Sequence, residues 1–183
     1  MPADLGHAGL IDGFAAFDTA LGTCGVRWSA HGITEVLLPP ARTRGGESRT
    51  DPSAAPAPAP VREAIAGIVA LLAGERRDLR AVVLDERAVD PFRLRVYAAA
   101  REIAPGTTVS YGEVAAAIGE PGAARAVGAA LGANPFPIIV PCHRVLAATG
   151  ALHGFSAPGG ITTKRRMLEI ERAPGFTQQA LFA

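Results

Sequence analysis

The sequence predicts a small α/β N-terminal domain followed by a mainly α-helical C-terminal domain. Three observations lead to this. Short apolar segments separated by glycines fill residues 13–39, and helical spacing of apolar residues recurs from residue 61 onwards. An alanine- and proline-rich stretch at 39–60 has no periodicity and separates the strand pattern from the first helix. We therefore expect an N-terminal domain at 1–90 with a Pro/Ala-rich loop at 39–60, a C-terminal domain at 91–175 and a tail at 176–183.

The N-terminal part is expected to combine a small sheet with one helix. Residues 13–39 have the pattern of two or three short strands. The turns are marked by Gly22, Gly25 and Gly32. Residues 61–73 place apolar side chains at helical spacing, and Gly74 follows them as a suitable C-cap. A short strand near 81–84 is expected to rejoin the first sheet.

The C-terminal part is expected to consist mainly of helices. Residues 92–103 have one apolar face, and a Pro-Gly pair follows them. Ser110 can cap a second helix at 111–118, with Glu113 three residues later completing a capping box. After a glycine-containing turn, a further short helix is expected at 123–131. Two short helices joined in this way have the outline of a helix-turn-helix in a winged-helix-like domain.

Charge is distributed unevenly along the chain. The first 91 residues carry nine basic and twelve acidic side chains, whereas the remaining residues carry nine basic and five acidic ones. A basic C-terminal half is compatible with a phosphate backbone as partner, although the net charge of +1 alone indicates no polyanionic ligand. Lys164 is the single lysine. The arginine bias favours planar and bidentate contacts, and GC-rich coding would produce the same bias.

Two cysteines, Cys24 and Cys142, lie in unrelated contexts and follow no metal-ligand spacing. Because the sequence has no signal peptide and no apolar run long enough to span a bilayer, the cytoplasm is the expected location. In that reducing compartment a conspicuous cysteine is more often catalytic or inert than disulfide-bonded. Cys24 with His7 and His31 offers only one thiol at poor spacing, so no zinc site is expected there.

The expected helix at 123–131 is unusual for a DNA-reading element, because it consists of small apolar residues and a single charge, Arg125. Major-groove readers need arginine, asparagine or glutamine side chains that reach base edges. A helix of small residues approaches a surface closely, which suits sequence-independent docking in a minor groove with one arginine as a probe. The alternative is a core helix that packs tightly and keeps Arg125 on its solvated side.

The segment NPFPIIVPCHRVL, residues 134–146, places reactive groups directly after an apolar run. Residues 138–140 have the composition of a buried strand, and Pro141 ends it. Cys142 is a candidate nucleophile, and His143 is the candidate base that would remove its proton. Because neighbouring residues of an extended chain point to opposite faces, this pair needs a turn at Pro141 or an intervening water.

This segment resembles the active-site motif of the O6-alkylguanine-DNA alkyltransferases, also called methylated-DNA–protein-cysteine methyltransferases. The similarity runs through TVSYGEVAAAIGEPGAARAVGAALGANPFPIIVPCHRVL, residues 108–146, and extends more loosely to residues 17–39. The resemblance implies DNA repair by direct damage reversal. It implies irreversible, single-turnover transfer of the alkyl group of O6-alkylguanine in flipped-out DNA to the protein's own cysteine, with O4-alkylthymine left open as a second substrate.

The resemblance also implies a role for individual residues in catalysis. Cys142 would accept the alkyl group, and His143 would take its proton through a water. Glu171 would hydrogen-bond and orient His143. Asn134 would position the cysteine turn, and Tyr111 would donate a proton to the departing guanine.

A second group of residues would bind DNA and the flipped base. Arg125 would replace the flipped nucleotide in the base stack. The other DNA contacts are expected from Ala124, Ala126, Gly128 and Arg144. The base pocket is expected to be lined by Leu131, Pro137, Val145, Phe155 and Ser156.

The sequence departs from the family pattern in the loop HGFSAPGG. Phe155 stands where the family commonly has a tyrosine, so stacking on the base is kept but a hydroxyl is lost. The loop is also longer than usual by Ala157-Pro158, which affects the expected position of Ser156 and the alkyl groups that fit. Tyr97 stands where a tryptophan is frequent, which we interpret as packing. The TKRR run at 163–166 either touches phosphates or begins a solvated helix.

The family reaction needs no metal and no organic cofactor, so none is expected. The expected partner is alkylated double-stranded DNA, bound in the minor groove largely independently of sequence by a monomer. Two other classes of protein stay open at this point. One is a non-catalytic lesion binder of the same fold, and the other is an unrelated cysteine hydrolase or a small transcription regulator.

Overall fold

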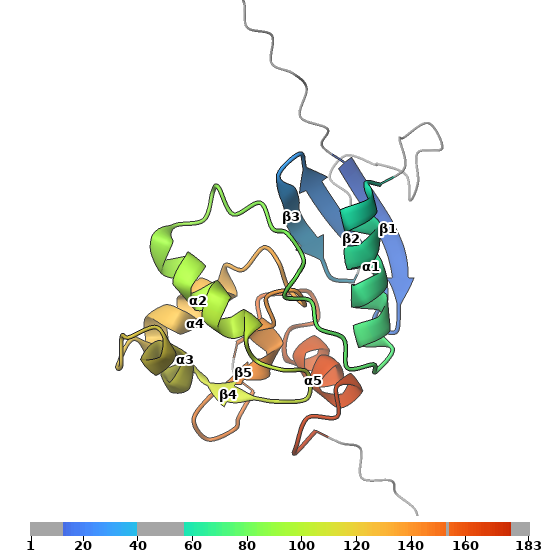
Figure 1. The fold of residues 1–183 in the computed structure, drawn as a ribbon. Helices are drawn as coiled ribbons and strands as arrows, with labels where there is room; N and C mark the ends of the chain where they lie inside the picture. Colours follow the sequence, from blue (N-terminus) through green and yellow to red (C-terminus); the bar gives the residue numbers. More distant parts are fainter. Residues whose placement is uncertain (1–12, 40–56, 153, 177–183) are drawn as a thin grey trace, which may run out of the picture.

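The computed structural model describes residues 13–39, 57–152 and 154–176. Most of the predicted loop at 39–60 lies outside these residues, as do His7, His153 and residues 177–183 of the predicted tail. The N-terminal part forms an antiparallel sheet in the order β1 (Gly13–Thr19), β2 (Gly22–Ser29) and β3 (Gly32–Leu37). Helix α1 (Ala59–Leu72) runs alongside this sheet (Figure 1).

Two of the three glycines predicted at turns are found there, and the third is not. Gly22 and Gly32 adopt φ values of 115° and 140° at the two hairpin turns, a region that favours glycine because it lacks a Cβ. Gly25 instead lies within β2, opposite Ala16. A Cβ on Gly25 would come within 2.7 Å of the Phe14 ring, so this glycine makes room for an aromatic side chain.

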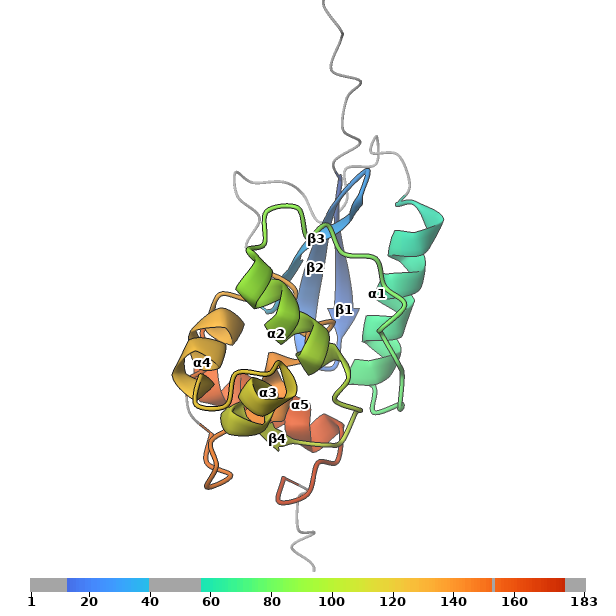
Figure 2. The ribbon, with the colours of Figure 1, turned by 60° about the vertical axis from the view of Figure 1, so that its left-hand side comes forward.

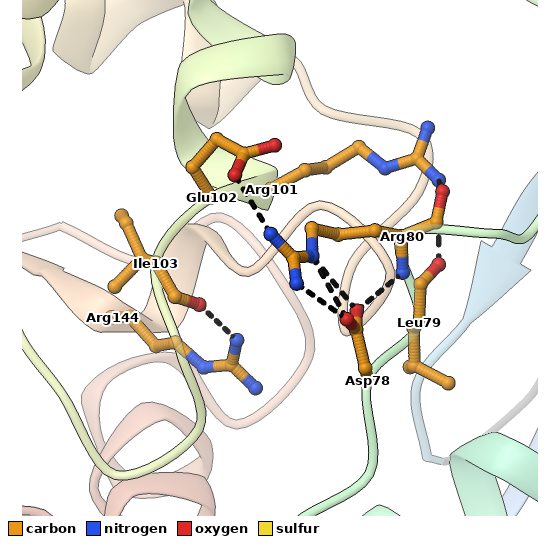
Figure 3. Close-up of polar contacts among 7 residues, drawn as sticks. All are labelled: Asp78, Leu79, Arg80, Arg101, Glu102, Ile103 and Arg144. Atoms are coloured by element: carbon orange, nitrogen blue, oxygen red, sulfur yellow. Dashed lines mark hydrogen bonds and ion pairs between the residues drawn. The ribbon is translucent and has the colours of Figure 1, made fainter.

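The expected strand near 81–84 is reduced to one parallel bridge between Leu84 and Ile33. The bridge is closed by two backbone hydrogen bonds, in which Ile33 N donates to Val83 O and Asp85 N donates to Ile33 O. Between α1 and this bridge, the chain is held by Arg101, whose Nη2 donates to the carbonyls of Leu79 and Arg80 (Figure 3). The same nitrogen also donates to the carbonyl of Val82.

The C-terminal part is helical with one short parallel strand pair. Its elements are α2 (Pro91–Arg101), β4 (Val109–Ser110), α3 (Tyr111–Ala117), α4 (Ala124–Gly132), the 3-10 helix η1 (Cys142–Arg144), β5 (Val145–Leu146) and α5 (Gly160–Ile170). The predicted helices are confirmed with small shifts at their ends. The predicted capping box is also present, since Ser110 Oγ accepts from Glu113 N at 3.1 Å and the Glu113 carboxylate accepts from Ser110 N at 2.6 Å. In Figure 2, α2–α5 gather below and to the left of the sheet, while α1 stands to its right.

One continuous cluster of buried apolar residues joins the sheet, α1 and the C-terminal helices. The domain boundaries therefore stay predictions. A backbone hydrogen bond of 2.8 Å from Val36 N to Pro135 O attaches β3 directly to the segment before the cysteine. Tyr97 is completely buried and donates its hydroxyl to Ala130 O at 3.1 Å, which confirms the packing role predicted for it. In the described part of the chain, no helix is both long and apolar enough to cross a membrane.

Candidate active site

The apolar run before the cysteine is buried, as predicted, but it is not a strand. Ile138, Ile139 and Val140 are at most 2 % exposed. Ile138 has a φ of 76°, and Pro137 bridges Val140, so the run is a tight turn. A β-branched residue in the left-handed region is strained, and such strain persists only where the surroundings impose it.

The side chain of Asn134 holds this turn by hydrogen bonds to its backbone. Its Nδ2 donates to Val140 O at 2.9 Å, and its Oδ1 accepts from Phe136 N at 2.9 Å. One side chain thus satisfies both ends of the turn, and a further hydrogen bond from Asn134 reaches the Cys142 side chain. This geometry agrees with the positioning role predicted for Asn134.

The chain then passes through η1, which turns Cys142 and His143 inwards together. Cys142 is 8 % exposed and His143 is 1 % exposed. The 3-10 turn replaces the extended conformation in which neighbouring side chains would diverge. Sequence reasoning had anticipated that a turn was needed here, and the structure supplies it one residue after Pro141.

His143 and Glu171 form a buried hydrogen bond, with His143 Nε2 2.8 Å from Glu171 Oε1. Burial would raise the pKa of Glu171, but hydrogen bonds and charges from His143 and Arg144 bring it to about 2. The carboxylate is therefore ionised and can only accept, so Nε2 must carry the proton. Burial lowers the pKa of His143, which leaves a neutral ring at pH 7 with a free lone pair on Nδ1. Nδ1 is buried and has no hydrogen-bond partner among the described residues.

Arg144 was predicted to contact DNA, but its side chain is buried in the protein interior. It is 5 % exposed. Its Nε and Nη2 donate to both Glu171 oxygens at 2.9 and 2.7 Å, and its Nη1 donates to Ile103 O at 2.6 Å. Such bidentate pairs with a carboxylate are strong and directional. Gly106 N also donates to Glu171 at 3.0 Å. Arg144 therefore belongs to the buried hydrogen-bond network that supports His143.

Lys164 is the residue that sequence reasoning missed. Both meanings considered for the TKRR run made this lysine solvent-accessible, yet it is 1 % exposed. Its Nζ donates to Val145 O at 2.7 Å and lies 5.7 Å from the centre of the Tyr111 ring. No carboxylate is paired with it in the described residues. Burial lowers the pKa of Lys164, and the charge of Cys142 acts in the opposite direction. The one available signal was that a chain rich in arginine keeps a single lysine.

Opposing effects act on the pKa of Cys142, and burial is the largest of them. Burial raises the pKa of its thiol, whereas the Asn134 hydrogen bond and the Lys164 charge lower it. Burial likewise raises the pKa of Tyr111, which keeps its hydroxyl protonated at neutral pH. The thiol and the phenol are therefore both neutral at rest, and a proton acceptor must act before the sulfur can attack.

A cavity of about 530 Å3 adjoins Cys142. Of the predicted base-pocket residues, Leu131, Pro137, Phe155 and Ser156 line it. Val145 does not, because its side chain is completely buried in the core. The Ser156 hydroxyl donates to Gly132 O at 2.6 Å, at the end of α4. The cavity also has a wall that sequence reasoning did not foresee, formed by Glu35, Val36, Leu37 and Leu38.

Helix α4 presents two different faces. Val127, Ala130 and Leu131 are buried against the core, whereas Arg125 and Ala126 are exposed. Within the described residues, Arg125 has neither an ion pair nor a hydrogen-bond acceptor. The helix therefore combines both alternatives from the sequence: small residues pack on one side, and a free arginine projects from the other.

The described residues contain no cluster of three or more histidine, cysteine, aspartate or glutamate side chains placed to hold a metal ion. Cys24 is buried in the sheet, and burial raises the pKa of its thiol. A thiol in this condition is a poor nucleophile and a poor metal ligand.

Comparison with known proteins agrees with this site. Residues 91–173 match the family model described as "6-O-methylguanine DNA methyltransferase, DNA binding domain". The methylated-DNA–protein-cysteine methyltransferase of Mycobacterium tuberculosis is 47 % identical over 127 residues, which are 69 % of this chain and 74 % of that protein. The enzyme of the same name from Methanothermobacter thermautotrophicus is 33 % identical over 147 residues, 80 % of this chain and 78 % of that one.

Solved structures show the same relationship. The structure of Mycobacterium tuberculosis OGT in complex with DNA superposes with a TM-score of 0.66 at 38 % identity, over 89 % of this chain and 96 % of that one. The O6-methylguanine-DNA methyltransferase of Pyrococcus kodakaraensis gives a TM-score of 0.63 at 26 % identity, over 87 % and 99 % of the two chains. The chain therefore belongs to the methylated-DNA–protein-cysteine methyltransferase family.

Proposed function

We propose that this protein repairs alkylated DNA by transferring the alkyl group from O6 of a flipped-out guanine to Cys142, once per molecule. The observation that carries the proposal is the buried, unpartnered Nδ1 of His143 beside a cysteine that opens onto a cavity. A neutral imidazole with its lone pair facing inwards is a base held ready for a proton. A water between Nδ1 and the thiol would complete the path.

Proton transfer from Cys142 to His143 creates one negative and one positive charge in a dry interior. Each has a counter-charge already in place. Lys164 carries a positive charge that acts on Cys142, and Glu171 accepts the Nε2 hydrogen of His143. Arg144 holds the carboxylate in position with two hydrogen bonds. Preorganised charges of this kind stabilise a transition state without reorganisation at the moment of reaction.

The displacement itself forms one bond and breaks another. The Cys142 sulfur lone pair attacks the alkyl carbon, and the C–O6 electrons move into guanine. Tyr111 gives its proton to the leaving guanine, because the anion would be a poor leaving group. His143 then holds the proton that came from the thiol. The thioether product has no leaving group that water could displace, so the reaction ends after one turnover.

The DNA side of the proposal rests on α3 and α4. These helices would form a helix-turn-helix, with α4 entering the minor groove through small residues, namely the exposed Ala126 and the partly exposed Ala124 and Gly128. Arg125 would occupy the space left by the flipped nucleotide, since the narrow groove attracts arginine. Contacts to phosphates and groove walls carry little sequence information, so binding would be largely sequence-independent and sensitive to salt. We infer a monomer that works on chromosomal DNA in the cytoplasm.

The test is the mass of the intact protein after mixing with a duplex that carries one O6-methylguanine. We expect a stoichiometric gain of one methyl group that maps to the peptide containing Cys142. The Cys142→Ala variant should gain none and still bind the alkylated duplex. A lesion that disappears without any change in protein mass would contradict single-turnover transfer and indicate a true catalyst.

Arg125→Ala tests the role of α4. We expect slower repair of duplex DNA by at least about tenfold, because flipping loses the group that fills the stack. Transfer from free O6-benzylguanine should change much less, since no flipping is needed there. Arg62→Ala, which removes an exposed arginine on α1, is the matched control. Equal losses on the duplex and on the free base would remove the role assigned to Arg125.

A non-catalytic lesion binder of the same fold is the second candidate. It is favoured only by the high resting pKa of the buried thiol. An alkylated duplex that stays bound and intact, with no gain in protein mass, would support this candidate.

A further inference from the structure

A cleft of about 210 Å3 lies between the segment after α1 and the C-terminal end of α2. It shares no lining residue with the cavity beside Cys142. Five arginines line this cleft, namely Arg76, Arg77, Arg80, Arg101 and Arg144. We propose that the cleft binds a small phosphate anion, either inorganic phosphate or pyrophosphate. This site is independent of the proposed alkyl transfer.

The charges of the cleft do not balance. Arg80 is bonded to both acids of the lining, with Asp78 at 2.7 Å and Glu102 at 2.8 Å. Arg144 is paired with Glu171, which lies behind the lining. The other three arginines have no ion pair with a carboxylate in the described part of the chain. Five arginines therefore face three acids, and the surplus of two positive charges matches the charge that a phosphate group approaches near neutral pH.

Arg101 is half-buried, yet its guanidinium is only partly bonded. Its Nη2 donates to three backbone carbonyls, of which Arg80 O is at 2.7 Å. Its Nε and Nη1 have no acceptor among the described residues, and Figure 3 shows no partner for that end of the side chain among the residues drawn. The acids Glu86, Asp78 and Glu102 act on Arg101 through space only. Carbonyl groups do not neutralise a charge, so an anion that accepts from the two unused nitrogens would stabilise it.

Arg76 and Arg77 follow α1 and are both exposed. The Arg76 guanidinium lies over the C-terminal part, because a Cβ on Gly106 would be 3.9 Å from Arg76 Nη2. Neither arginine side chain makes a hydrogen bond or ion pair with another described residue. Both side chains can therefore turn towards an anion bonded to Arg101 without breaking an interaction of the fold.

The size and the floor of the cleft favour a small anion. Its volume is below the range of about 300–1,000 Å3 that holds drug-sized ligands, so a nucleotide would not fit. The floor includes Ile103, Ile138 and Ile139, which are at most 8 % exposed, and an apolar floor strengthens the attraction between charges. At the rim, the carboxylates of Asp78 and Glu102 are 56 % and 69 % exposed. They would repel the further phosphates of a DNA strand, whereas a single small anion brings none.

An anion in the cleft would join two parts of the molecule. Arg76 and Arg77 belong to the segment after α1, whereas Arg101 ends α2. A planar guanidinium binds phosphate oxygens in pairs, so contacts from both segments to one phosphate group are possible at the same time. A ligand that binds only the folded chain stabilises that chain. Occupation of the cleft should therefore raise the temperature of unfolding.

The experiment measures the binding of pyrophosphate, and separately of inorganic phosphate, by isothermal titration calorimetry at constant ionic strength. We expect saturable binding of one anion per protein and a higher midpoint of thermal unfolding. The double variant Arg76→Gln/Arg77→Gln should bind at least about tenfold more weakly, since a hydrogen bond to a charged group contributes on that scale. Arg101→Gln should also weaken binding. That variant loses three bonds of the fold as well, so the double variant decides.

The controls separate a specific site from general surface charge. Arg62→Gln removes an exposed arginine of α1 outside the cleft and should leave the affinity unchanged. Sodium chloride at the same ionic strength should not raise the midpoint of unfolding. Pyrophosphate should still bind when an unmodified DNA duplex saturates the protein. Methyl transfer by the double variant should match that of the unaltered protein.

Four outcomes would overturn the inference. They are no saturable binding of either anion, a folded double variant that binds as tightly as the unaltered protein, an equal loss of affinity in Arg62→Gln, and displacement of pyrophosphate by the duplex. The last of these would assign the cleft to DNA phosphates. None of the four bears on the proposed alkyl transfer, which the mass of the protein tests separately.

Discussion

Two arginine–carboxylate clusters lie on opposite sides of one cleft, and they differ in what surrounds them. The cleft, of about 210 Å3, is lined by Arg80, Arg101 and Arg144 among others. On its outer side, Arg80 bonds Asp78 and Glu102, as Figure 3 shows. On its inner side, Arg144 bonds Glu171. The side chains of the outer cluster are 53–69 % exposed, whereas those of Arg144 and Glu171 are 5 % and 2 % exposed.

The two acids Asp78 and Glu171 have the same pKa of about 2 but for different reasons. At Asp78 the hydrogen bonds of Arg80 act almost unopposed, and solvent screens them. At Glu171 the hydrogen bonds and charges of His143 and Arg144 overcome a large burial effect. A lowered pKa by itself does not identify a functional acid. A buried acid with a buried charged partner is a better candidate, because removing the acid leaves the charge of the partner uncompensated in the interior.

The largest expected effect comes from making the same change in both clusters. Glu171→Gln keeps the shape of the side chain but leaves Arg144 buried without a counter-charge, which should cost about 3–5 kcal/mol in the free energy of unfolding. Asp78→Asn should cost at most about 1 kcal/mol. Urea unfolding measures both. Equal losses would mean that burial does not distinguish the clusters.

The same two substitutions also test whether the two clusters differ in their effect on alkyl transfer. Glu171→Gln should slow alkyl transfer strongly, because His143 then loses the negative charge that stabilises its ring when it takes the proton of the thiol. Asp78→Asn should leave the transfer rate unchanged. The rates are measured with O6-methylguanine duplex under conditions where both variants are folded.

Lys164→Met gives the next largest effect and tests a charge without a carboxylate. We expect the pKa of Cys142 to rise, and the transfer rate near pH 7 to fall by about tenfold for each unit of rise. Raising the pH should restore much of the rate, which structural damage would not allow. Ultraviolet absorbance of the thiolate follows the pKa directly. A pH profile identical to that of the unaltered protein would contradict the role assigned to Lys164.

The smallest expected effect is the contribution of His143 to stability as a function of pH. Burial lowers its pKa in the folded state, so below about pH 6.5 the unfolded chain binds a proton that the native chain does not. Stability should therefore fall as the pH drops from 7.5 to 5.5. The fall should be smaller in His143→Gln, and thermal unfolding at both pH values measures it. Identical slopes would show that His143 does not titrate in this range.

Local sequence signals determined the secondary structure well. The capping box of Ser110 and Glu113, the periodicity of α1 and α2, and the turns at Gly22 and Gly32 all depend on neighbouring residues, so they are visible in the chain itself. The same holds for Cys142 and His143, because the motif that contains them is continuous.

Properties that depend on distant segments were decided only by the tertiary structure. The run 138–140 became a strained turn because Asn134 bonds both of its ends, a constraint that no propensity expresses. Arg144 turned inwards because the Glu171 carboxylate, 27 residues away, accepts hydrogen bonds from its Nε and Nη2. Lys164 was buried against Val145 O, and β3 became a wall of the cavity, because segments distant in the sequence pack together. Burial and charge pairing depend on segments from the whole fold. The sequence therefore shows which residues are charged, but not how far each is exposed to solvent or which residue it pairs with.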